Sequence, residues 1–464
     1  MSAPRNIAVI DVGKTNVKLA LADLERLEEL AVVTRPNAVR PGPPYPHFDL
    51  EGHWSFFLEH LAAFHESHGI DGISVTTHGA AAVLLDADGG LAAPMLDYEH
   101  TGPDAMAEAY DALRPPFAET GSPRLPMGLN LGAQLHWQLA CDPSLKDRIA
   151  HVVTYPQYWG FRLSGALATD MSSLGCHTDL WRPREGRFSD LPGRLGLEGK
   201  IAPPRRATEV LGPISAEIAH RTGLPADTQV VCGIHDSNAS LLPHLLGRAG
   251  PVSVVSTGTW VIAMSVGATA PSLDPARDTL INVDAFGQPV PSARFMGGRE
   301  YQLMSEGLTG APTGAEREAV LRDGIMLLPA VVPESGPFAG RTHRWSREPR
   351  SDGERLFALS LYLGLMTDTC LGLIGAEGPP LIEGPFARNR DVLDMLSALR
   401  PGGVETAASA TGTSIGAALL FAPGHSSATA RHDGPADPAP YRDYAARWRA
   451  ALGTQDRARA HQPV

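Results

Sequence analysis

The sequence is poor in the features that indicate a disulfide-stapled, secreted or membrane-spanning protein. It has only four cysteines in 464 residues and no CxxC pair, so neither a disulfide framework nor a zinc knuckle is indicated. No apolar run approaches the roughly 20 residues that a bilayer requires. The apolar run Ile7–Ile10 follows Arg5 and ends at Asp11, which is not the pattern of a signal peptide. We therefore expect a reduced, cytoplasmic protein that does not enter a membrane.

Basic residues are also too few for a nucleic-acid partner. The formal net charge is −12 at pH 7, whereas binding to a phosphate backbone requires a basic surface. A single nucleotide is compatible with this charge, because a local nest of backbone amides can hold phosphate on an acidic protein. Hydrophobic residues make up 43% of the chain, which is a globular composition, and the length predicts two or three domains.

Two similar strand–turn–strand segments lie about half a chain apart. The runs Ile7–Ile10 and Val17–Ala22 flank a polar turn that contains a glycine, and Val252–Val255 and Trp260–Val266 flank another. Both segments predict hairpins, and two hairpins that open two halves favour a duplicated fold over a chance likeness. Strands alternate with helical segments elsewhere, which predicts an α/β protein.

The remaining chain predicts further elements of both kinds. Strands are expected at Gly72–Thr76, Ala81–Leu85, His151–Thr154, Gln229–Gly233 and Pro380–Glu383. Helices are expected at Trp54–His65, Asp104–Leu113, Glu354–Ile374 and Ser414–Phe421. The segment Tyr441–Leu452 predicts an amphipathic helix with Tyr444 and Trp448 on one face, a stripe more typical of packing than of partner binding.

Three familiar patterns are incomplete or absent. Gly13-Lys14-Thr15 resembles part of a P-loop, but Ala8 stands where a glycine is required, and a strand follows in place of a helix. No GxGxxG occurs, which disfavours a dinucleotide site. Gly412-Thr413-Ser414-Ile415-Gly416 matches the GxSxG nucleophile elbow, but only a Pro-rich tail follows to supply the acid and the histidine. We favour a glycine-lined turn with close backbone approach there, and a serine hydrolase using Ser414 is the alternative.

The turn after the first strand has the chemistry of a phosphate site. Asp11 ends the strand, Gly13 lets backbone amides approach an anion, and Lys14, Thr15 and Asn16 add donors. A carboxylate beside phosphate donors suits a hydrated Mg²⁺ that bridges phosphate groups. Taken alone, this turn would be interpreted as an ordinary hairpin.

A second turn and a third segment change that balance. Another glycine turn with hydroxyls is formed by Thr257, Gly258 and Thr259. Two such loops favour a site that holds phosphate groups from opposite sides over two unrelated turns. Asp236 follows a strand and leads into a small-residue helix. A carboxylate there can accept the proton of an attacking hydroxyl, and the simpler alternative is a helix N-cap.

The ordered set of these segments resembles a known family. DVGKTN at 11–16, GIHD at 233–236, STGTW at 256–260 and EGPFARN at 383–389 look like the FGGY carbohydrate kinases, over about Asn6 to Ala422. Within the family, the sequence resembles most the rhamnulose, fuculose and related ketose kinases. The resemblance implies an α/β protein of two actin/hexokinase-like, ribonuclease H-like domains that flank a deep cleft. A sugar-binding domain would span 1–246 and a nucleotide-binding domain 247–464.

The resemblance also implies roles for individual residues. Asp236 would be the catalytic base, Asp11 and Asp236 would contact Mg²⁺ through water, and Gly258 and Thr259 would hold the terminal phosphates. The adenosine would be bordered by Gly384, Pro385, Asn389 and Gly412. Sugar contacts would come from His78, Gly79, Asp97, Glu99 and His100. An aromatic face would come from Tyr98, Trp137, Tyr158 or Trp159.

Three departures from the family pattern bear on specificity. Glu383-Gly384-Pro385 replaces the usual Gly-Gly start of the adenosine segment, Lys14 stands where Thr is more usual, and Ala80–Ala82 replaces bulkier or polar residues. We expect an ATP- and Mg²⁺-dependent kinase acting on a small sugar, a ketose such as rhamnulose, fuculose, xylulose or ribulose. The alternative with the same fold is a sensor or scaffold that binds nucleotide without transferring phosphate. The oligomeric state is not identified by the sequence, and a homodimer is one expectation.

Overall fold

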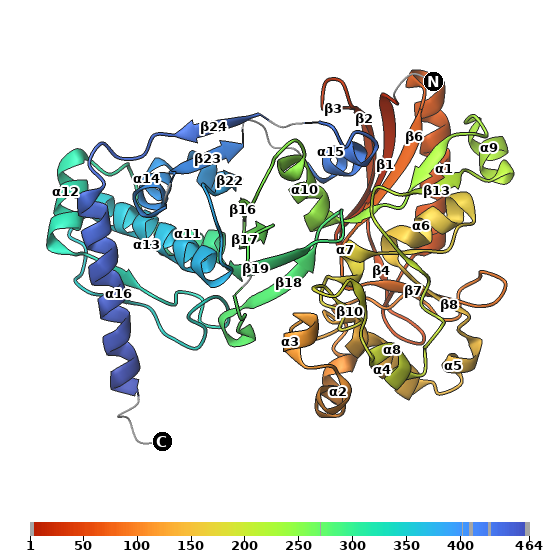
Figure 1. Ribbon diagram of the computed structural model, residues 1–464, viewed down its shortest axis with the longest axis horizontal. Helices are drawn as coiled ribbons and strands as arrows, with labels where there is room; N and C mark the ends of the chain where they lie inside the picture. Colours follow the sequence, from red (N-terminus) through yellow and green to blue (C-terminus); the bar gives the residue numbers. More distant parts are fainter. Residues whose placement is uncertain (1–3, 270, 401, 408–411, 426–427, 460–464) are drawn as a thin grey trace. The chain divides into compact units, whose positions relative to one another are not determined.

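The chain folds into two compact units. The structure is a computed structural model and describes residues 4–269, 271–400, 402–407, 412–425 and 428–459. The first unit consists of Met1–Arg248, Ile281–Val290 and Thr411–Ser426, and the second of Ala249–Leu280, Pro291–Ala410 and Ser427–Val464. Figure 1 labels the elements of both units.

The units are not two consecutive pieces of chain. The predicted ranges 1–246 and 247–464 cut the chain once, whereas the first unit also takes in 281–290 and 411–426. These later segments make hydrogen bonds within the first unit. The Ser74 hydroxyl donates to the Ala417 carbonyl at 2.8 Å, and the Ile281 amide donates to the Gly121 carbonyl at 2.9 Å.

The first unit is built on a mixed sheet with the strand order β13-β14-β6-β1-β2-β3. The strands are β1 (Asn6–Val12), β2 (Asn16–Asp23), β3 (Glu28–Pro36), β6 (Gly72–Thr77), β13 (Val210–Pro213) and β14 (Gln229–Val231), and β15 (Ile234–His235) also pairs with β6. Strand β1 is antiparallel to β2 and parallel to β6. Strand β14 is parallel to β6 and antiparallel to the edge strand β13.

The second unit repeats this plan. Its sheet has the order β18-β19-β17-β16-β22-β23-β24. The strands are β16 (Val252–Thr257), β17 (Val261–Val266), β18 (Thr279–Val283), β19 (Pro289–Phe295), β22 (Leu381–Glu383), β23 (Val404–Ala407) and β24 (Thr429–His432). Strand β16 is antiparallel to β17 and parallel to β22, and β24 is antiparallel to β23. The order and sense of β24-β23-β22-β16-β17-β19 match those of β13-β14-β6-β1-β2-β3, and β18 is an additional strand. This match is the result that a duplicated fold predicts.

Helices accompany both sheets. The longer helices of the first unit are α1 (Leu50–His68), α4 (Leu131–Cys141), α6 (Tyr155–Ser164) and α10 (Asp236–Leu245). Its short helices are α2 (Ala107–Leu113), α3 (Phe117–Thr120), α5 (Leu145–Arg148), α7 (Met171–Leu174), α8 (Leu191–Leu195), α9 (Ala216–Thr222) and α15 (Thr413–Ala418). The second unit has α11 (Gly297–Ser305), α12 (Gly314–Asp323), α13 (Asp352–Leu373), α14 (Arg390–Leu399) and α16 (Ala439–Arg459). A separate strand pair joins β7 (Ala82–Leu85) to β8 (His151–Thr154).

Strand β1 is buried on both faces of the sheet. Its successive side chains point to opposite sides, so they belong alternately to two apolar clusters. Ala8 and Ile10 belong to the apolar cluster that includes residues of α1, whereas Ile7 and Val9 belong to the cluster that includes residues of α15. Figure 1 shows α1 and α6 on one side of this sheet and α10 and α15 on the other. Asp11 continues the alternation of Ile7 and Val9, so its carboxylate faces the side covered by α10 and α15.

Most predicted elements are present, with differences at their ends. Strand β1 continues to Val12, so Asp11 lies inside the strand and pairs with Lys18 of β2. The predicted helix Asp104–Leu113 is a 3-10 turn (Gly102–Met106) followed by α2. The predicted strand Gln229–Gly233 ends at Val231 and restarts at Ile234, because Gly233 adopts a positive φ of 89° that interrupts the extended backbone.

Helix α13 is the central apolar helix of the second unit. Contrary to the expectation that no run is long enough for a bilayer, α13 is the one helix in the described part of the chain that is long and apolar enough to cross a membrane. However, 72% of its most apolar stretch is buried inside the protein. Phe357, Leu361 and Leu365 lie in the core cluster of this unit. The apolar surface of α13 is therefore used for packing.

Helix α16 packs against the same core. Tyr444 is fully buried and Trp448 is 1% exposed. The Tyr444 hydroxyl donates to the Ile325 carbonyl, and the Trp448 indole donates to the Leu327 carbonyl, both at 2.8 Å. The prediction that this aromatic stripe serves packing is confirmed.

A buried carboxyl group in α11 makes the second unit sensitive to pH. Glu300 is 1% exposed, and its carboxylate accepts bonds from the Val332 amide at 3.1 Å and the Tyr362 hydroxyl at 3.0 Å. Burial outweighs these bonds and raises the pKa of Glu300 to about 7. Because the folded state holds this proton more tightly than the unfolded state, stability falls as pH rises between the ordinary pKa and about 7.

We predict that Glu300→Gln removes this pH dependence. The neutral amide keeps an acceptor for one bond and needs no proton. Relative to wild type, the variant should gain up to about 3 kcal/mol of unfolding free energy between about pH 5 and pH 8. Urea unfolding of both proteins at the two pH values measures this. A difference between the proteins that is the same at both pH values would contradict the assignment.

Candidate active site

Asp11 is a largely buried carboxylate held by two partners. Its Oδ2 atom lies 3.1 Å from Lys18 Nζ, and the Ser414 hydroxyl donates to the same oxygen at 3.1 Å. Burial raises the pKa of Asp11, and the nearby negative charge of Asp236 acts in the same direction, whereas Lys18 and Ser414 oppose them. The two carboxylates are therefore close enough to affect each other's ionisation.

Asp236 is the first residue of α10 and is not its N-cap, which is His235. Its Oδ1 atom accepts a bond from the Ser237 amide at 2.6 Å and lies 3.1 Å from His235 Nε2. Its side chain is 34% exposed. Burial disfavours the charge, but His235 and the Ser237 amide outweigh that effect and hold the pKa of Asp236 below its ordinary value. Asp236 is thus an ionised, accessible acceptor, and the simple N-cap interpretation does not apply.

His78 interacts electrostatically with Asp236, and one of its two ring nitrogens has no hydrogen-bond partner among the described residues. Its Nδ1 atom is 3.1 Å from the Gly79 carbonyl, and burial lowers the pKa of the ring, which is therefore neutral at pH 7. With the proton on Nδ1 donated to Gly79, Nε2 is an acceptor. Within the described part of the chain this buried Nε2 has no hydrogen-bond partner. A ligand hydroxyl is the group that would complete it.

Gly79 keeps the space in front of two other side chains open. A Cβ atom at this position would lie 2.6 Å from Cys176 Sγ and 2.7 Å from His235 Nε2. Cys176 Sγ itself is 3.5 Å from His235 Nε2. Burial opposes the thiolate, but His235 and His177 outweigh it and bring the pKa of the Cys176 thiol to about 5. Sequence reasoning missed Cys176, because a lone cysteine remote from GIHD in the chain carries no local signal.

The segment predicted to contact a sugar is held together at Asp97. Its Oδ1 atom accepts a hydrogen bond from the Glu99 amide at 3.2 Å. The same oxygen forms an ion pair with the ammonium of Lys14. The neighbouring His100 ring packs edge-on against Trp137, with centroids 5.0 Å apart.

Two of the four aromatic candidates lie near these polar groups. The Tyr98 ring packs against His78 at 5.0 Å, and Trp137 packs against His100. Tyr158 and Trp159 instead belong to the apolar core beside α1. The choice between them required the fold, because all four residues look alike in the sequence.

The turn at 13–16 has few contacts of its own. The Gly13 amide donates to the Asn16 carbonyl at 2.9 Å, and the Asn37 side chain donates to the Gly13 carbonyl at 2.8 Å. Thr15 and Asn16 are exposed. The ammonium of Lys14 pairs with the 95–100 segment, although the sequence assigned this residue to phosphate.

Within the second unit, two of the predicted nucleotide segments meet at Thr257. Its hydroxyl donates to the Glu383 carbonyl at 2.5 Å and accepts a bond from the Phe386 amide at 3.1 Å. Gly384 has a φ of 81°, and a Cβ there would lie 2.0 Å from the Thr257 carbonyl oxygen. Only glycine permits this approach, so the glycine turn after β16 and the EGPF segment form one assembly.

Other predicted residues of these segments lie nearby or have structural tasks. Gly258 and Thr259 are exposed. The Gly258 carbonyl oxygen would be 2.0 Å from a Cβ on Gly298, a close approach that the sequence did not indicate. Pro385 opens a 3-10 turn, and Asn389 caps α14 by accepting from the Val392 amide at 3.3 Å.

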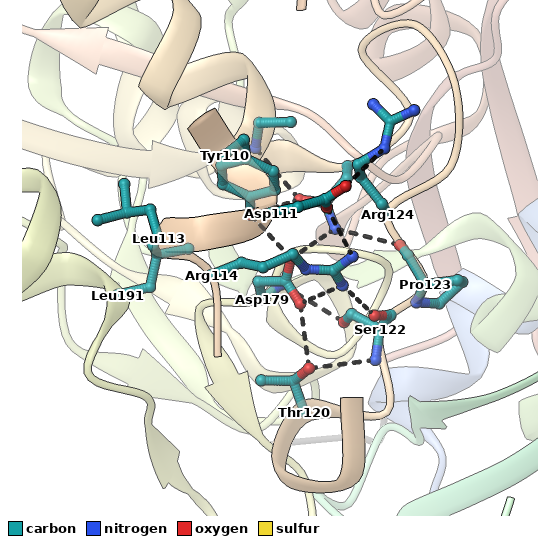
Figure 2. Close-up of polar contacts among 12 residues, drawn as sticks. Tyr110, Asp111, Leu113, Arg114, Thr120, Ser122, Pro123, Arg124, Asp179 and Leu191 are labelled. Atoms are coloured by element: carbon teal, nitrogen blue, oxygen red, sulfur yellow. Dashed lines mark hydrogen bonds and ion pairs between the residues drawn. The ribbon is translucent and has the colours of Figure 1, made fainter. Parts of the chain in front are cut away.

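A buried carboxylate, that of Asp179, lies in the segment that follows Cys176, and Figure 2 shows the polar contacts around it. Asp179 is fully buried and adopts a positive φ of 59°. Its carboxylate accepts bonds from Tyr110 at 2.7 Å, Arg114 at 2.9 Å, Thr120 at 3.0 Å and Asn130 at 2.9 Å. A strained backbone persists only where its surroundings fix it, and this network does so. The network therefore fixes the backbone at Asp179, close in the chain to Cys176, whose sulfur contacts His235.

The donor set suits a hydrated magnesium ion rather than a resident metal. Mg²⁺ prefers oxygen ligands and is usually bound by one or two carboxylates together with substrate phosphates. Asp11 and Asp236 are such carboxylates. The described residues contain no group of three or more His, Cys, Asp or Glu side chains that could hold a metal ion. The residues fit an ion that arrives with a nucleotide.

Comparison with known proteins defines the family. Residues 6–243 match the N-terminal domain of the FGGY family of carbohydrate kinases, and residues 249–430 match the carbohydrate kinase FGGY C-terminal domain. A carbohydrate kinase from Novosphingobium aromaticivorans is 38% identical with a TM-score of 0.87, covering 96% of this chain and 99% of its own. This chain belongs to the FGGY family of carbohydrate kinases.

More remote relatives add detail. An L-fuculokinase of Salmonella typhi is 25% identical over 271 residues, and the match covers 56% of this chain and 56% of that relative. A xylulose kinase from Rhodospirillum rubrum is 22% identical with a TM-score of 0.76, covering 97% of this chain and 99% of its own, and this likeness concerns the fold alone. The predictions of the family and of the two-domain α/β fold are confirmed. The two domain ranges and the individual site residues stay predictions.

The GxSxG segment offers a matched test of the packing around Asp11. A Cβ on Gly416 would lie 1.8 Å from the Ala239 carbonyl oxygen of α10, whereas a Cβ on Gly412 would have nothing within 4 Å. We predict that Gly416→Ala destabilises the first unit by at least about 2 kcal/mol. Gly412→Ala, at the N-cap of α15, should cost about 1 kcal/mol or less. Equal unfolding midpoints for the two variants in urea would contradict this packing.

Proposed function

We propose that this protein transfers the γ-phosphoryl group of ATP to a hydroxyl of a small ketose. Its family consists of carbohydrate kinases, and ATP is their co-substrate. The named relatives are L-fuculokinases and xylulose kinases. Rhamnulose, fuculose, xylulose and ribulose are therefore the first sugars to assay.

The observation that carries the proposal is the ionised carboxylate of Asp236, which interacts with the carboxylate of Asp11 and with the ring of His78. Asp236 is stabilised by His235 and exposes a third of its side chain. Asp11 and His78 each interact electrostatically with Asp236. A general base, an oxygen ligand for a nucleotide-bound cation and a hydroxyl acceptor thus lie in one unit.

The reaction follows from this arrangement. A sugar hydroxyl oxygen attacks the γ-phosphorus in line with the bridging oxygen to the β-phosphate. The new O–P bond forms as the bridging O–P bond breaks, and ADP leaves. Asp236 accepts the hydroxyl proton, and general-base help of this kind contributes roughly 10²–10⁴-fold.

Asp11 and Asp236 would hold Mg²⁺ through water molecules. When bound with ATP, this ion supplies positive charge that neutralises the phosphates. Lys18 and Ser414 hold the Asp11 carboxylate in place for that task. The phosphate contacts proposed for Gly13, Thr15, Asn16, Gly258 and Thr259, and the adenosine contacts proposed for Gly384, Pro385, Asn389 and Gly412, follow the family pattern.

His78 and Asp97 are proposed to bind the sugar. The buried Nε2 atom of His78 accepts one hydroxyl, and the carboxylate of Asp97 accepts another. Tyr98 presents an aromatic ring beside both groups. Gly79, Glu99 and His100 complete the segment.

Two other functions have less support. A sensor that binds nucleotide without transfer would not need an ionised Asp236 supported by His235. A serine hydrolase would need a histidine beside Ser414, but Ser414 is fully buried and donates to Asp11.

We also propose a cytoplasmic location and a homodimer, with no nucleic-acid or membrane partner.

We predict that Asp236→Asn lowers kcat by about 10²-fold or more while ATP still binds. The amide keeps the shape of the side chain but cannot accept a proton. Steady-state assays of ADP release with a panel of ketoses measure kcat, and calorimetry with MgATP measures binding. A variant within about threefold of the wild-type kcat would remove Asp236 from this role.

We predict that Asp11→Asn raises the Mg²⁺ concentration for half-maximal rate by about tenfold or more. Ser414→Ala is the matched control, since it removes one hydrogen bond from Asp11 but keeps the carboxylate. That variant should shift the Mg²⁺ requirement much less. Equal shifts in both variants would argue against an ion held by Asp11.

A further inference from the structure

Lys14 stands in the turn assigned to phosphate, but its ammonium group lies elsewhere. Lys14 Nζ forms ion pairs with Oδ1 of Asp97 and, at 3.1 Å, with Oε2 of Glu99. Its side chain is 19% exposed, and that of Asp97 is 9% exposed. This cation is costly to move, because the buried carboxylate of Asp97 would lose its compensating charge, whereas the Glu99 side chain is 55% exposed and would be compensated by water.

Aromatic rings enclose the same ammonium. Lys14 Nζ lies 5.2 Å from the Phe48 ring centroid and 5.0 Å from that of Tyr98, within the range of cation–π attraction. These two rings also pack against His78, at 5.4 Å and 5.0 Å. Lys14 and the hydroxyl acceptor His78 therefore pack against the same two rings, those of Phe48 and Tyr98.

The contacts of Asp97 define which of its oxygens is left for a ligand. Among the contacts of the described residues, the Lys14 ammonium and the Glu99 amide both bind Oδ1. This arrangement fixes the rotation of the carboxylate and leaves Oδ2 to accept a hydroxyl. Without the ammonium, the like charges of Asp97 and Glu99 would repel each other, and the Asp97 carboxylate would lose the ion pair that fixes its rotation.

The second lysine of the hairpin provides a contrast. Lys18 Nζ lies 3.1 Å from Asp11 Oδ2 and 3.3 Å from Glu29 Oε1. The hairpin thus supplies one lysine to the carboxylate beside the nucleotide's cation and another to the sugar segment.

We propose that Lys14 is a positioning residue for sugar binding and determines sugar affinity, in place of a phosphate ligand. It acts by orienting Asp97 and Glu99 toward the hydroxyls of a polyhydroxy substrate. This inference rests on the proposed kinase function. It also explains why lysine stands where threonine is more usual in the family, since threonine is too short to reach Asp97 across the two rings.

The test separates the two substrates of the reaction. Lys14→Met keeps the length and the aromatic packing of the side chain but removes the charge. We expect the KM for the sugar to rise by about tenfold or more, with kcat falling less and the KM for ATP staying within about twofold. Calorimetric affinity for MgATP should match wild type. Lys18→Met is the matched control, and it should change the ATP and Mg²⁺ dependence without this rise in the sugar KM.

A rise in the KM or Kd for ATP with an unchanged sugar KM would overturn the inference and return Lys14 to the phosphate site. Lys14→Thr, the more usual residue, provides a second variant if thermal melting shows that Lys14→Met is unfolded, and the same split is expected. Wild-type protein that phosphorylates no sugar in the panel would overturn the proposed function and the inference together. An active wild type with the opposite split overturns the inference alone.

Discussion

The structure depends most on how negative charge is held beside the sheet of the first unit. Asp11 and Asp236 affect each other's ionisation, and burial disfavours the charged form of both. Lys18 and the Ser414 hydroxyl compensate the first carboxylate, and His235 compensates the second. Removing one partner from such a group leaves an uncompensated charge, which is strongly destabilising. Elements remote in the chain converge here, because Ser414 reaches Asp11 from α15, and the close approach of α15 to α10 in turn requires Gly416.

The local pattern of the sequence was sufficient for most of the scaffold. Apolar runs around the glycine turns predicted both hairpins, and the Tyr444 and Trp448 stripe predicted a packed helix. Local patterns did not reveal that 281–290 and 411–426 join the first unit, because hydrogen bonds to distant residues determine it. The break of the predicted strand at Gly233 was missed for a different reason. Glycine can adopt either sign of φ, so the residue type alone does not reveal that this glycine has a positive φ.

The candidate site shows the same division. GIHD indicated Asp236 because it follows a predicted strand, and the resemblance to the family indicated His78. Cys176 and the network around Asp179 gave no signal, since their contacts join segments that are far apart in the chain. Lys14 is the instructive case. Its motif assigned it to phosphate, and its actual partners are two carboxylates that only the folded chain brings within reach.

The central claim is that Asp236 is the proton acceptor of a phosphoryl transfer to a sugar. A crystal structure of the protein with a non-hydrolysable ATP analogue, Mg²⁺ and a ketose that it phosphorylates tests this most directly. We expect one sugar hydroxyl within about 3 Å of an Asp236 carboxylate oxygen and oriented toward the γ-phosphate. If every hydroxyl of the bound sugar lay beyond hydrogen-bonding reach of Asp236, although the same protein phosphorylates this sugar with ATP in solution, the account would be contradicted.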